Sequence, residues 1–263
     1  MALLRFTFGT MGSGKSTQAL QIHHNLRARG LRTILTTQLD RSEGRVSSRL
    51  GVAADAEIVD SSVDLYELVA HRVASWGAVD AVICDEAQFY DPTQCEQLAR
   101  VVDRLGVDVY AFGLLTSFQG ELFPGTARLL ELADERSEIQ VEARCHCGAR
   151  ATHNARFVDG VQVVAGQLKV VGDTVVGDTA VGTKAGDDSP GPATGEVTYD
   201  LLCRRHWMAG AEAARGAQLE LLDHEEGRAE DRPGRTGPVE VDVDAVPDDL
   251  VATPGAVRSE ARR

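Results

Sequence analysis

Short apolar runs alternate with longer segments of mixed polar and apolar residues through the first half of the chain. The apolar runs predict buried strands at 3–8, 32–37, 79–84 and 108–113. The longer segments, which hold few helix breakers, predict helices at 15–29, 92–105 and 125–134. Strands and helices that alternate in this way form a parallel sheet with helices on both faces. The pattern therefore predicts an α/β domain over residues 1–142.

The pattern is weaker between residues 38 and 60. This segment contains Asp40 and Arg41, followed by the polar run 45–49. Two interpretations fit it, a flexible loop close to a bound phosphate and an ordinary solvated surface loop. The sequence favours neither, and Asp40 and Arg41 are not assigned to a site.

A glycine-rich segment joins the first predicted strand to the first predicted helix. It fits the pattern G-x-x-x-x-G-K-[ST]. In such a loop the backbone N–H groups surround a nucleotide β-phosphate, the lysine reaches the β- and γ-phosphates, and the hydroxyl binds Mg²⁺. The alternative is a tight connection without a ligand, but Lys15 and Ser16 argue against it. We expect a nucleoside triphosphate to bind Gly9, Thr10, Met11, Gly12, Ser13, Gly14, Lys15 and Ser16.

Two acidic residues follow the third predicted strand. Open parallel sheets bind ligands at the carboxyl ends of their strands, so Asp85 and Glu86 are expected beside the glycine-rich loop. Asp85 is suited to hold Mg²⁺ with Ser16, and Glu86 to accept a proton from an attacking hydroxyl or to position a water. The alternative is that both acids only close a strand. The expected nucleotide-binding set then also includes Asp85, Glu86, Ala87 and Gln88.

Cysteine and histidine residues gather in two short segments of the following region. The first holds Cys145 and Cys147, and the second holds Cys203 and His206. Two pairs of such ligands predict a structural Zn²⁺ site, which stabilises a small β domain over residues 143–210 that is too short to bury its own core. The C-x-C spacing is tighter than the usual C-x₂-C, so His146 is an alternative ligand.

The segment between the two ligand pairs is rich in Gly, Val and Asp. A run Val-Val-Gly-Asp-Thr at 170–174 is repeated at 175–179. A short tandem repeat of this kind predicts an expanded loop at about 165–197 rather than a folded repeat domain. A helix is predicted from about 207 to 222.

Composition and charge limit the classes of protein that fit. A chain of 263 residues with 43% hydrophobic residues builds one large or two small domains with a real core. Its net charge of −13 argues against a nucleic-acid partner, although 12 acidic and 6 basic residues lie in 220–263. The tail 223–263 is expected to be disordered. No apolar run reaches the length of a membrane span and no signal peptide is evident, so we expect a cytoplasmic protein without a membrane partner.

Five motifs occur in an order that identifies a family. They are the glycine-rich loop 9–16, the run 85–89, the run 118–125, Cys147 with its following residues, and Cys203-Arg-Arg-His206. Together they resemble thymidine kinases of the type II (cellular and bacterial) family over about residues 3–210. The resemblance implies a RecA-like P-loop domain joined to a zinc-bearing lasso domain, assembled as a homotetramer. It also implies the reaction of ATP with thymidine to give ADP and dTMP in pyrimidine salvage.

The resemblance also implies roles for single residues. Glu86 is the base that takes the proton of the 5′-hydroxyl, and Asp85 holds Mg²⁺ through water. Met11 lies near the thymine methyl, Phe118 packs against the base, and Tyr199 lies on the sugar or base side of the lasso. Backbone groups of the lasso read the pyrimidine edge, and the end product dTTP inhibits. The tight C-x-C pair and the long insertion depart from the family pattern.

Three other functions compete with this interpretation. A RecA-like ATPase motor or repair protein would hydrolyse ATP faster with DNA, but no basic or aromatic binding stripe is evident. A non-catalytic nucleotide sensor would retain the loop and the zinc site without needing Glu86. A kinase for a different nucleoside would most readily accept deoxyuridine, because one methyl group changes specificity by only about 1–3 kcal/mol.

Overall fold

The computed structural model describes residues 1–38, 45–48, 51–139, 142–168 and 197–216. Asp40 and Arg41, most of the predicted loop 165–197 and the predicted tail 223–263 lie outside the described residues. The described residues all belong to one compact unit. Within the part described, no helix combines the length and the apolar character needed to cross a membrane.

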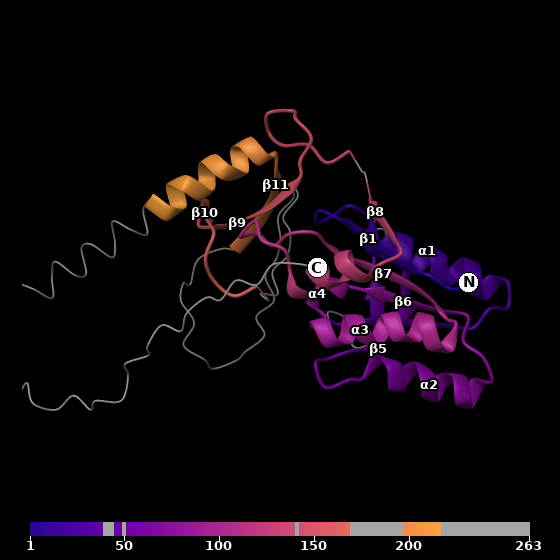
Figure 1. Ribbon diagram of the computed structural model, residues 1–263. Helices are drawn as coiled ribbons and strands as arrows, with labels where there is room; N and C mark the ends of the chain where they lie inside the picture. Colours follow the sequence, from indigo (N-terminus) through magenta and orange to yellow (C-terminus); the bar gives the residue numbers. More distant parts are fainter. Residues whose placement is uncertain (39–44, 49–50, 140–141, 169–196, 217–263) are drawn as a thin grey trace, which may run out of the picture. The chain divides into compact units, whose positions relative to one another are not determined.

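A six-stranded sheet forms the centre of this unit (Figure 1). Its order is β5-β2-β6-β7-β1-β8, and every neighbouring pair is parallel. The strands are β1 (Leu4–Gly9), β2 (Thr33–Thr37), β5 (Glu57–Ile58), β6 (Ala81–Asp85), β7 (Asp108–Leu114) and β8 (Glu135–Glu138). The predicted parallel α/β sheet is confirmed.

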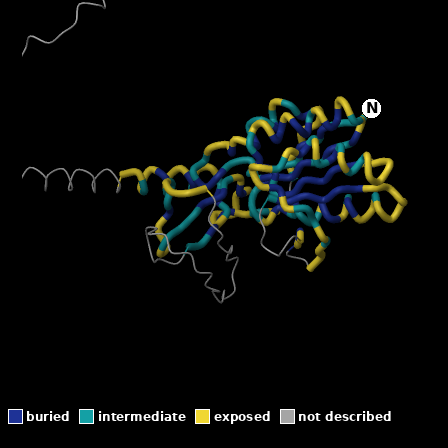
Figure 2. The backbone as a smooth tube through the Cα atoms, turned by 90° about the horizontal axis from the view of Figure 1, so that it is seen from below, coloured by how far each residue is buried: buried dark blue, intermediate teal, exposed yellow. Residues whose placement is uncertain are grey.

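The central strands are buried on both faces (Figure 2). β2 and β6 are buried at every position. Along β6 the side chains alternate, so that Val82 and Cys84 enter one apolar cluster while Ala81 and Ile83 enter another. Helix α1 (Lys15–Ala28) packs in the second cluster, and α2 (Leu65–Trp76), α3 (Pro92–Arg100) and α4 (Pro124–Leu132) pack in the first. Helices therefore cover both faces, as predicted.

Helix α2 was not predicted, although its ends carry clear sequence signals. The Asp64 carboxylate accepts a hydrogen bond from the Glu67 N–H and caps the first turn. Gly77 ends the helix with a φ of 82°. Between them Leu65 and Val69 are one helical turn apart and fully buried. The sequence therefore contained apolar residues at a helical spacing.

The predicted helix 92–105 is only partly correct. It begins at a capping box formed by Asp91 and Gln94, but the α-helix ends at Arg100 and Val101–Leu105 is a π-helical turn. Val101 and Val102 in this turn are buried in the core. The edge strand β8 was also missed, because all four of its residues are exposed and give no apolar signal.

A smaller antiparallel sheet lies in the metal-binding region. It consists of β9 (His153–Val158), β10 (Val161–Val163) and β11 (Val197–Leu202), in the order β10-β9-β11. Residues 204–216 are helical, so this helix begins earlier than the predicted residue 207. A compact core joins the sheet to the helix: Cys145, Ala155, Leu202, Trp207 and Ala211.

The ambiguous segment 38–60 contributes a hairpin of β3 (Arg45–Ser47) and β4 (Ala53–Asp55). Val46 is buried in the cluster that contains α1. The hairpin is therefore packed on the sheet through Val46, which has an exposed polar residue on either side of it. The same segment also contributes the edge strand β5, which pairs with β2.

Candidate active site and metal centre

The glycine-rich loop begins at the end of β1 and leads directly into α1. Gly14 has a φ of 84°, a left-handed conformation that glycine adopts without strain. A Cβ atom on Gly9 would lie 2.6 Å from the Ser13 Oγ, so the loop closes tightly on itself. The Lys15 ammonium donates hydrogen bonds to the Thr10 carbonyl at 2.7 Å and to Ser13 Oγ at 3.4 Å. Its positive charge is thus held at the loop that is expected to bind phosphate.

A cavity of about 390 Å³ opens beside this loop. The strand register brings the carboxyl ends of the strands together there, since Thr37 pairs with Asp85 and Gly9 pairs with Leu114. Residues 11–16, Asp85, Glu86 and Gln88 all line the cavity. The structure therefore brings the two predicted motifs together at the sheet edge where open α/β folds bind ligands. Ala87, which was expected in the same set, is buried in the core.

Asp85 is the last residue of β6 and is almost fully buried. Burial and the nearby Glu86 carboxylate raise the pKa of Asp85 to about 6, although a hydrogen bond with the Ser16 side chain and the Lys15 charge act in the opposite direction. A buried carboxylate in contact with the loop hydroxyl is a suitable donor set for a hard cation such as Mg²⁺. Such a cation would favour the ionised carboxyl.

Glu86 adopts a left-handed conformation with a φ of 55°, which is uncommon for a residue other than glycine. This conformation separates it from β6 before the short 3₁₀ turn Ala87–Phe89 begins. Buried Gln88 donates a hydrogen bond from Nε2 to the Glu86 Oε2 at 2.6 Å, and its Oε1 accepts one from the Leu114 N–H at 3.0 Å. Glu86 is therefore oriented at the cavity by an amide that is fixed to the end of β7.

The three residues expected around a nucleoside base lie in different surroundings. Met11 lines the cavity, and its N–H donates a hydrogen bond to the Asn154 Oδ1 at 2.9 Å. Phe118 is 4% exposed and lies beneath the Arg156 guanidinium, whose carbon is 5.2 Å from the ring centroid. Tyr199 is also buried. In this conformation, neither aromatic side chain is part of the cavity wall.

Two residues that the sequence analysis did not single out join the small sheet to the site. Buried Asn154 also donates a hydrogen bond from Nδ2 to the Thr116 carbonyl at 3.0 Å, so its amide connects the segment after β7 to the phosphate loop. The Trp207 indole N–H donates to the Phe118 carbonyl at 3.2 Å. Local sequence patterns carry no signal for such contacts, because the partners are far apart along the chain.

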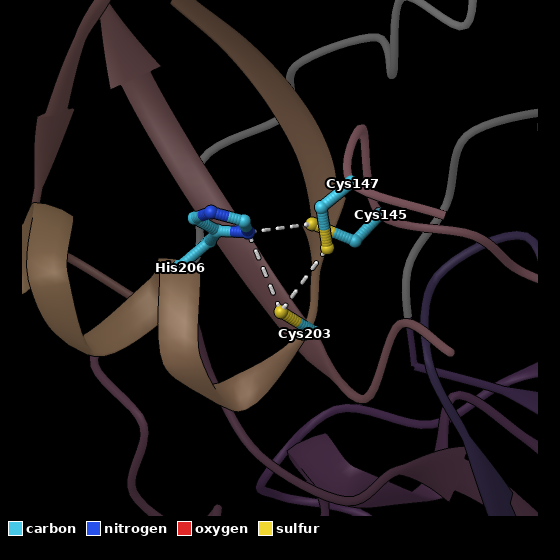
Figure 3. Close-up of side chains that lie close together, drawn as sticks. All are labelled: Cys145, Cys147, Cys203 and His206. Atoms are coloured by element: carbon cyan, nitrogen blue, oxygen red, sulfur yellow. Dashed lines mark hydrogen bonds between the residues drawn. The ribbon is translucent and has the colours of Figure 1, made fainter. Parts of the chain in front are cut away.

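The four expected metal ligands converge on one point (Figure 3). The His206 Nδ1 lies 3.3 Å from the Cys145 Sγ and 3.5 Å from the Cys203 Sγ, and the Cys147 Sγ lies 3.9 Å from the Cys203 Sγ. Tetrahedral Zn²⁺ with bonds of about 2.0–2.3 Å places its ligand atoms about 3.4–3.8 Å apart. The cluster fits a zinc ion.

The chemistry of the thiols agrees with the geometry. Burial acts to raise the pKa of Cys145, but hydrogen bonds with the backbone of Cys147 and Cys203 and with the His206 ring lower it to about 6. The thiolate, which is the form that binds metal, therefore predominates at neutral pH. A hydrogen bond with the Ala149 backbone lowers the pKa of Cys147, yet local desolvation and the neighbouring thiols of Cys145 and Cys203 leave it raised. A cation between the sulfur atoms would relieve their mutual repulsion.

A tight turn explains how the short C-x-C spacing is accommodated. Gly148, with a φ of 81°, donates its N–H to the Cys145 carbonyl, and the Cys145 N–H donates to the Ala149 carbonyl. Both sulfur atoms of the first pair thereby reach the cluster. His146 lies outside the group of four ligands, with its ring centroid 4.2 Å from that of His206. The structure thus favours the Cys145, Cys147, Cys203 and His206 set over the alternative with His146.

The parallel sheet, the phosphate loop and the acidic residues at the tip of β6 define a P-loop phosphotransferase of the α/β class. A family model described as thymidine kinase matches residues 2–175 of the chain. The chain belongs to the thymidine kinase family.

Relatives in several bacteria support this assignment. The chain is 53% identical over 207 residues to a thymidine kinase of Streptomyces coelicolor, an alignment that covers 78% of this chain and 88% of the relative. It is 46% identical to a thymidine kinase of Cutibacterium acnes, covering 80% and 90% of the two chains. A solved structure of the Pif1 helicase from Candida albicans aligns with a TM-score of 0.35 and 15% identity over 53% of this chain and 36% of that one. A likeness this weak carries no argument about function.

Proposed function

We propose that the protein transfers the γ-phosphoryl group of ATP to the 5′-hydroxyl of thymidine, giving ADP and dTMP for nucleotide salvage. The observation that carries the proposal is Glu86, which Gln88 holds at a cavity that the phosphate loop also lines. A carboxylate so placed is suited to act on an acceptor hydroxyl, whereas the loop is suited to hold the donor. The names of the bacterial relatives supply the identity of the acceptor.

On the donor side, the loop Gly9–Ser16 binds the ATP phosphates through its backbone N–H groups. Lys15 exchanges its hydrogen bond with the Thr10 carbonyl for the β- and γ-phosphates. Ser16 and Asp85 hold Mg²⁺, which supplies positive charge against the transferring phosphoryl group. Lys15 stabilises the same charge from the loop side.

On the acceptor side, Glu86 accepts the proton of the 5′-hydroxyl as that oxygen attacks the γ-phosphorus. The Gln88 amide binds one carboxylate oxygen of Glu86, so that the other is directed to the substrate. The buried position of Gln88 between Glu86 and Leu114 limits the rotamers that Glu86 can adopt. Gln88 thus acts by positioning the base.

The thymine base contacts Met11, Phe118 and Tyr199, and the lasso backbone reads its pyrimidine edge. Phe118 and Tyr199 are buried in this conformation, so the proposal requires the segments around them to rearrange when the nucleoside binds. The Met11 N–H is already fixed by Asn154. A base bound against Met11 and Tyr199 therefore contacts both the phosphate loop and the small sheet.

The remaining parts of the proposal concern organisation. Residues 1–142 form the P-loop domain and 143–210 the lasso domain, with structural Zn²⁺ bound by Cys145, Cys147, Cys203 and His206. The enzyme is a cytoplasmic homotetramer that acts on a small-molecule substrate without a nucleic-acid or membrane partner, and dTTP inhibits it as a ligand that spans both substrate sites.

The decisive experiment measures ADP release from Mg-ATP by the purified protein with thymidine, deoxyuridine, deoxycytidine or no acceptor, each with and without single-stranded DNA. Thymidine-dependent release, with deoxyuridine as a weaker acceptor, is the expected result. Hydrolysis that ignores nucleosides and rises with DNA would replace the proposal with the motor interpretation. ATP binding without turnover in any mixture would replace it with the sensor interpretation.

A further inference from the structure

The loop between β7 and α4, residues 115–123, is held by the metal-bearing region at several points. We call it the β7–α4 loop. The Asn154 amide binds its Thr116 carbonyl, and the Trp207 indole binds its Phe118 carbonyl. The Gln119 side chain donates a hydrogen bond to the Gly166 carbonyl at 3.2 Å. The conformation of this loop therefore depends on the small sheet and the helix after it.

Trp207 makes one of these contacts and is the residue directly after the ligand His206. Its indole lies against Gly120, where a Cβ atom would be 2.4 Å from the ring Cη2 and 2.7 Å from Cζ2. Gly120 also has a φ of 82°, which favours glycine. The backbone of the loop and the flat indole thus fit each other in a way that no side chain at position 120 would permit.

Trp207 itself is fixed from its other sides. It is 7% exposed and belongs to the core that contains Cys145. Its ring centroid is 5.3 Å from that of His153, and its carbonyl accepts a hydrogen bond from the Gln162 side chain at 3.1 Å. The indole therefore cannot follow the loop unless the metal-bearing core moves as well.

At both of its ends, the same loop joins elements that position Glu86. The Leu114 N–H, just before the loop, binds Gln88, and the Leu114 carbonyl accepts a hydrogen bond from Thr126 at 2.7 Å. Just after the loop, Gly125 packs so tightly that a Cβ atom would lie 2.8 Å from the Ala87 carbonyl oxygen. A continuous set of contacts thus runs from the metal ligands through Trp207 to the turn that follows Glu86.

We propose that Trp207 is a positioning residue through which the metal centre sets the conformation of the β7–α4 loop and thereby the affinity for the nucleoside. The inference rests on the proposed function, which places Phe118 against the base. Loss of the indole leaves the buried Phe118 carbonyl without its donor and opens space beside Gly120. Lys15 and Ser16, which hold the donor phosphates, belong to a different segment of the chain, so ATP binding is not affected in the same way.

Steady-state kinetics of the full chain test the proposal. Trp207→Phe keeps an aromatic ring but removes the indole N–H, and should raise the thymidine KM about tenfold while the ATP KM changes less than about twofold. Gly120→Ala disturbs the same contact from the loop side without altering the metal-bearing region, and should show the same pattern. Trp76→Phe is the matched control, because Trp76 is 39% exposed on α2, and its constants should equal those of the wild type.

The outcomes separate the two proposals. Absence of thymidine turnover in wild type and in Trp76→Phe would defeat the proposed function. Normal turnover in both, together with a normal thymidine KM in Trp207→Phe, would overturn the role of Trp207. Equal increases of the thymidine and ATP KM values, or loss of bound zinc, in Trp207→Phe would mean general damage to the fold. The Gly120→Ala variant would then decide: a normal thymidine KM in it would overturn the role of Trp207, and a selective increase would support that role.

A spectroscopic measurement provides a readout that does not depend on turnover. The chain has two tryptophans, so the Trp76→Phe protein reports on Trp207 alone. The indole contacts the β7–α4 loop, and the proposed function requires the segment around Phe118 to rearrange when the nucleoside binds, so binding should change the surroundings of Trp207. Saturating thymidine should therefore change its fluorescence emission in the zinc-loaded protein, and deoxycytidine should not. An emission spectrum unchanged by thymidine, in protein that phosphorylates it normally, would overturn the proposal.

Discussion

The phosphate loop and the metal centre both lie next to strands, but they differ in how far apart their residues are along the chain. The loop is one contiguous segment between β1 and α1, in which the Lys15 ammonium donates hydrogen bonds to Thr10 and Ser13 of the same loop. The metal centre joins residues from two segments, since Cys145 and His206 are 61 positions apart. A local motif of the first kind is stable wherever the strand and helix form, whereas the second kind needs a folded sheet and a metal to stabilise it. We infer that the chemistry resides in the first region and that nucleoside selection depends on the second.

The largest effect is expected at the base. Glu86→Gln keeps the size of the side chain and the contact with Gln88, but removes the proton acceptor, so kcat should fall about 10³-fold. ATP affinity, measured by calorimetry, should stay within about twofold. Glu131→Gln, an exposed change on α4, is the control. A variant with nearly normal kcat would remove Glu86 from the mechanism.

The next effect separates the two regions. Cys203→Ser removes one sulfur ligand, and the small core around Trp207 is too small to fold well without the metal. We expect the zinc content to fall and the thymidine KM to rise about 100-fold, while ATP binding persists. His146→Ala is the matched control and should retain zinc, because His146 is outside the ligand group. Parallel loss of ATP binding in Cys203→Ser would show that the two regions do not fold separately.

A pH effect on stability is expected at Asp85 in the first region. Because burial raises the pKa of Asp85 to about 6, the ionised carboxyl destabilises the folded state above that pH, and this penalty disappears as the pH falls through 6 towards the unfolded value. Without nucleotide or Mg²⁺, Asp85→Asn should be more stable than wild type at pH 8 by about 2–3 kcal/mol. The difference should shrink towards pH 4 in denaturant titrations. A difference that is independent of pH would contradict this explanation.

A smaller effect is expected at Gln88. Gln88→Met keeps much of the volume but removes both amide hydrogen bonds, which leaves the Glu86 carboxylate less well oriented. We expect kcat to fall about tenfold with little change in either KM, as for loss of a positioning contact. Gln21→Met, at an exposed position on α1, serves as the control in the same kinetic assay. An increase in the thymidine KM alone would assign Gln88 to binding instead.

The smallest effect is expected from the acidic tail. Removal of residues 223–263 should leave kcat and both KM values within about twofold, because the described site and metal ligands lie before residue 217. Steady-state kinetics of the truncated and full chains check this. Loss of activity would show that the tail belongs to the folded enzyme.

Much of the first region could be read from the chain. The strands β1, β2, β6 and β7 were predicted to within about two residues, because parallel central strands are continuous apolar runs. The phosphate loop and the acids after β6 were found from spacing, and the structure brings them to one cavity. Helix α2 was missed although Asp64 and Gly77 mark its ends, whereas β8 has no apolar signal to find.

The second region could be predicted in its ligands but not in its connections. The metal-binding types Cys145, Cys147, Cys203 and His206 were evident from the sequence, and the converging distances show that they can share one ion. The choice against His146 needed the turn at Gly148. Asn154 and Trp207, which connect this region to the site, could not be identified from the sequence. A single Asn or Trp that belongs to no motif is most often structural.

The sequence by itself therefore determined the phosphate loop, the parallel strands, the acidic pair and the metal-ligating side chains, because each depends on residue type and short spacing. Only the tertiary structure decided how Gln88 orients Glu86, how Asn154 fixes the phosphate loop, and how Trp207 fits against Gly120. Those contacts join residues that are distant in the chain, or depend on backbone conformations such as that of Glu86. They are set by the packing of whole elements, which no local pattern encodes.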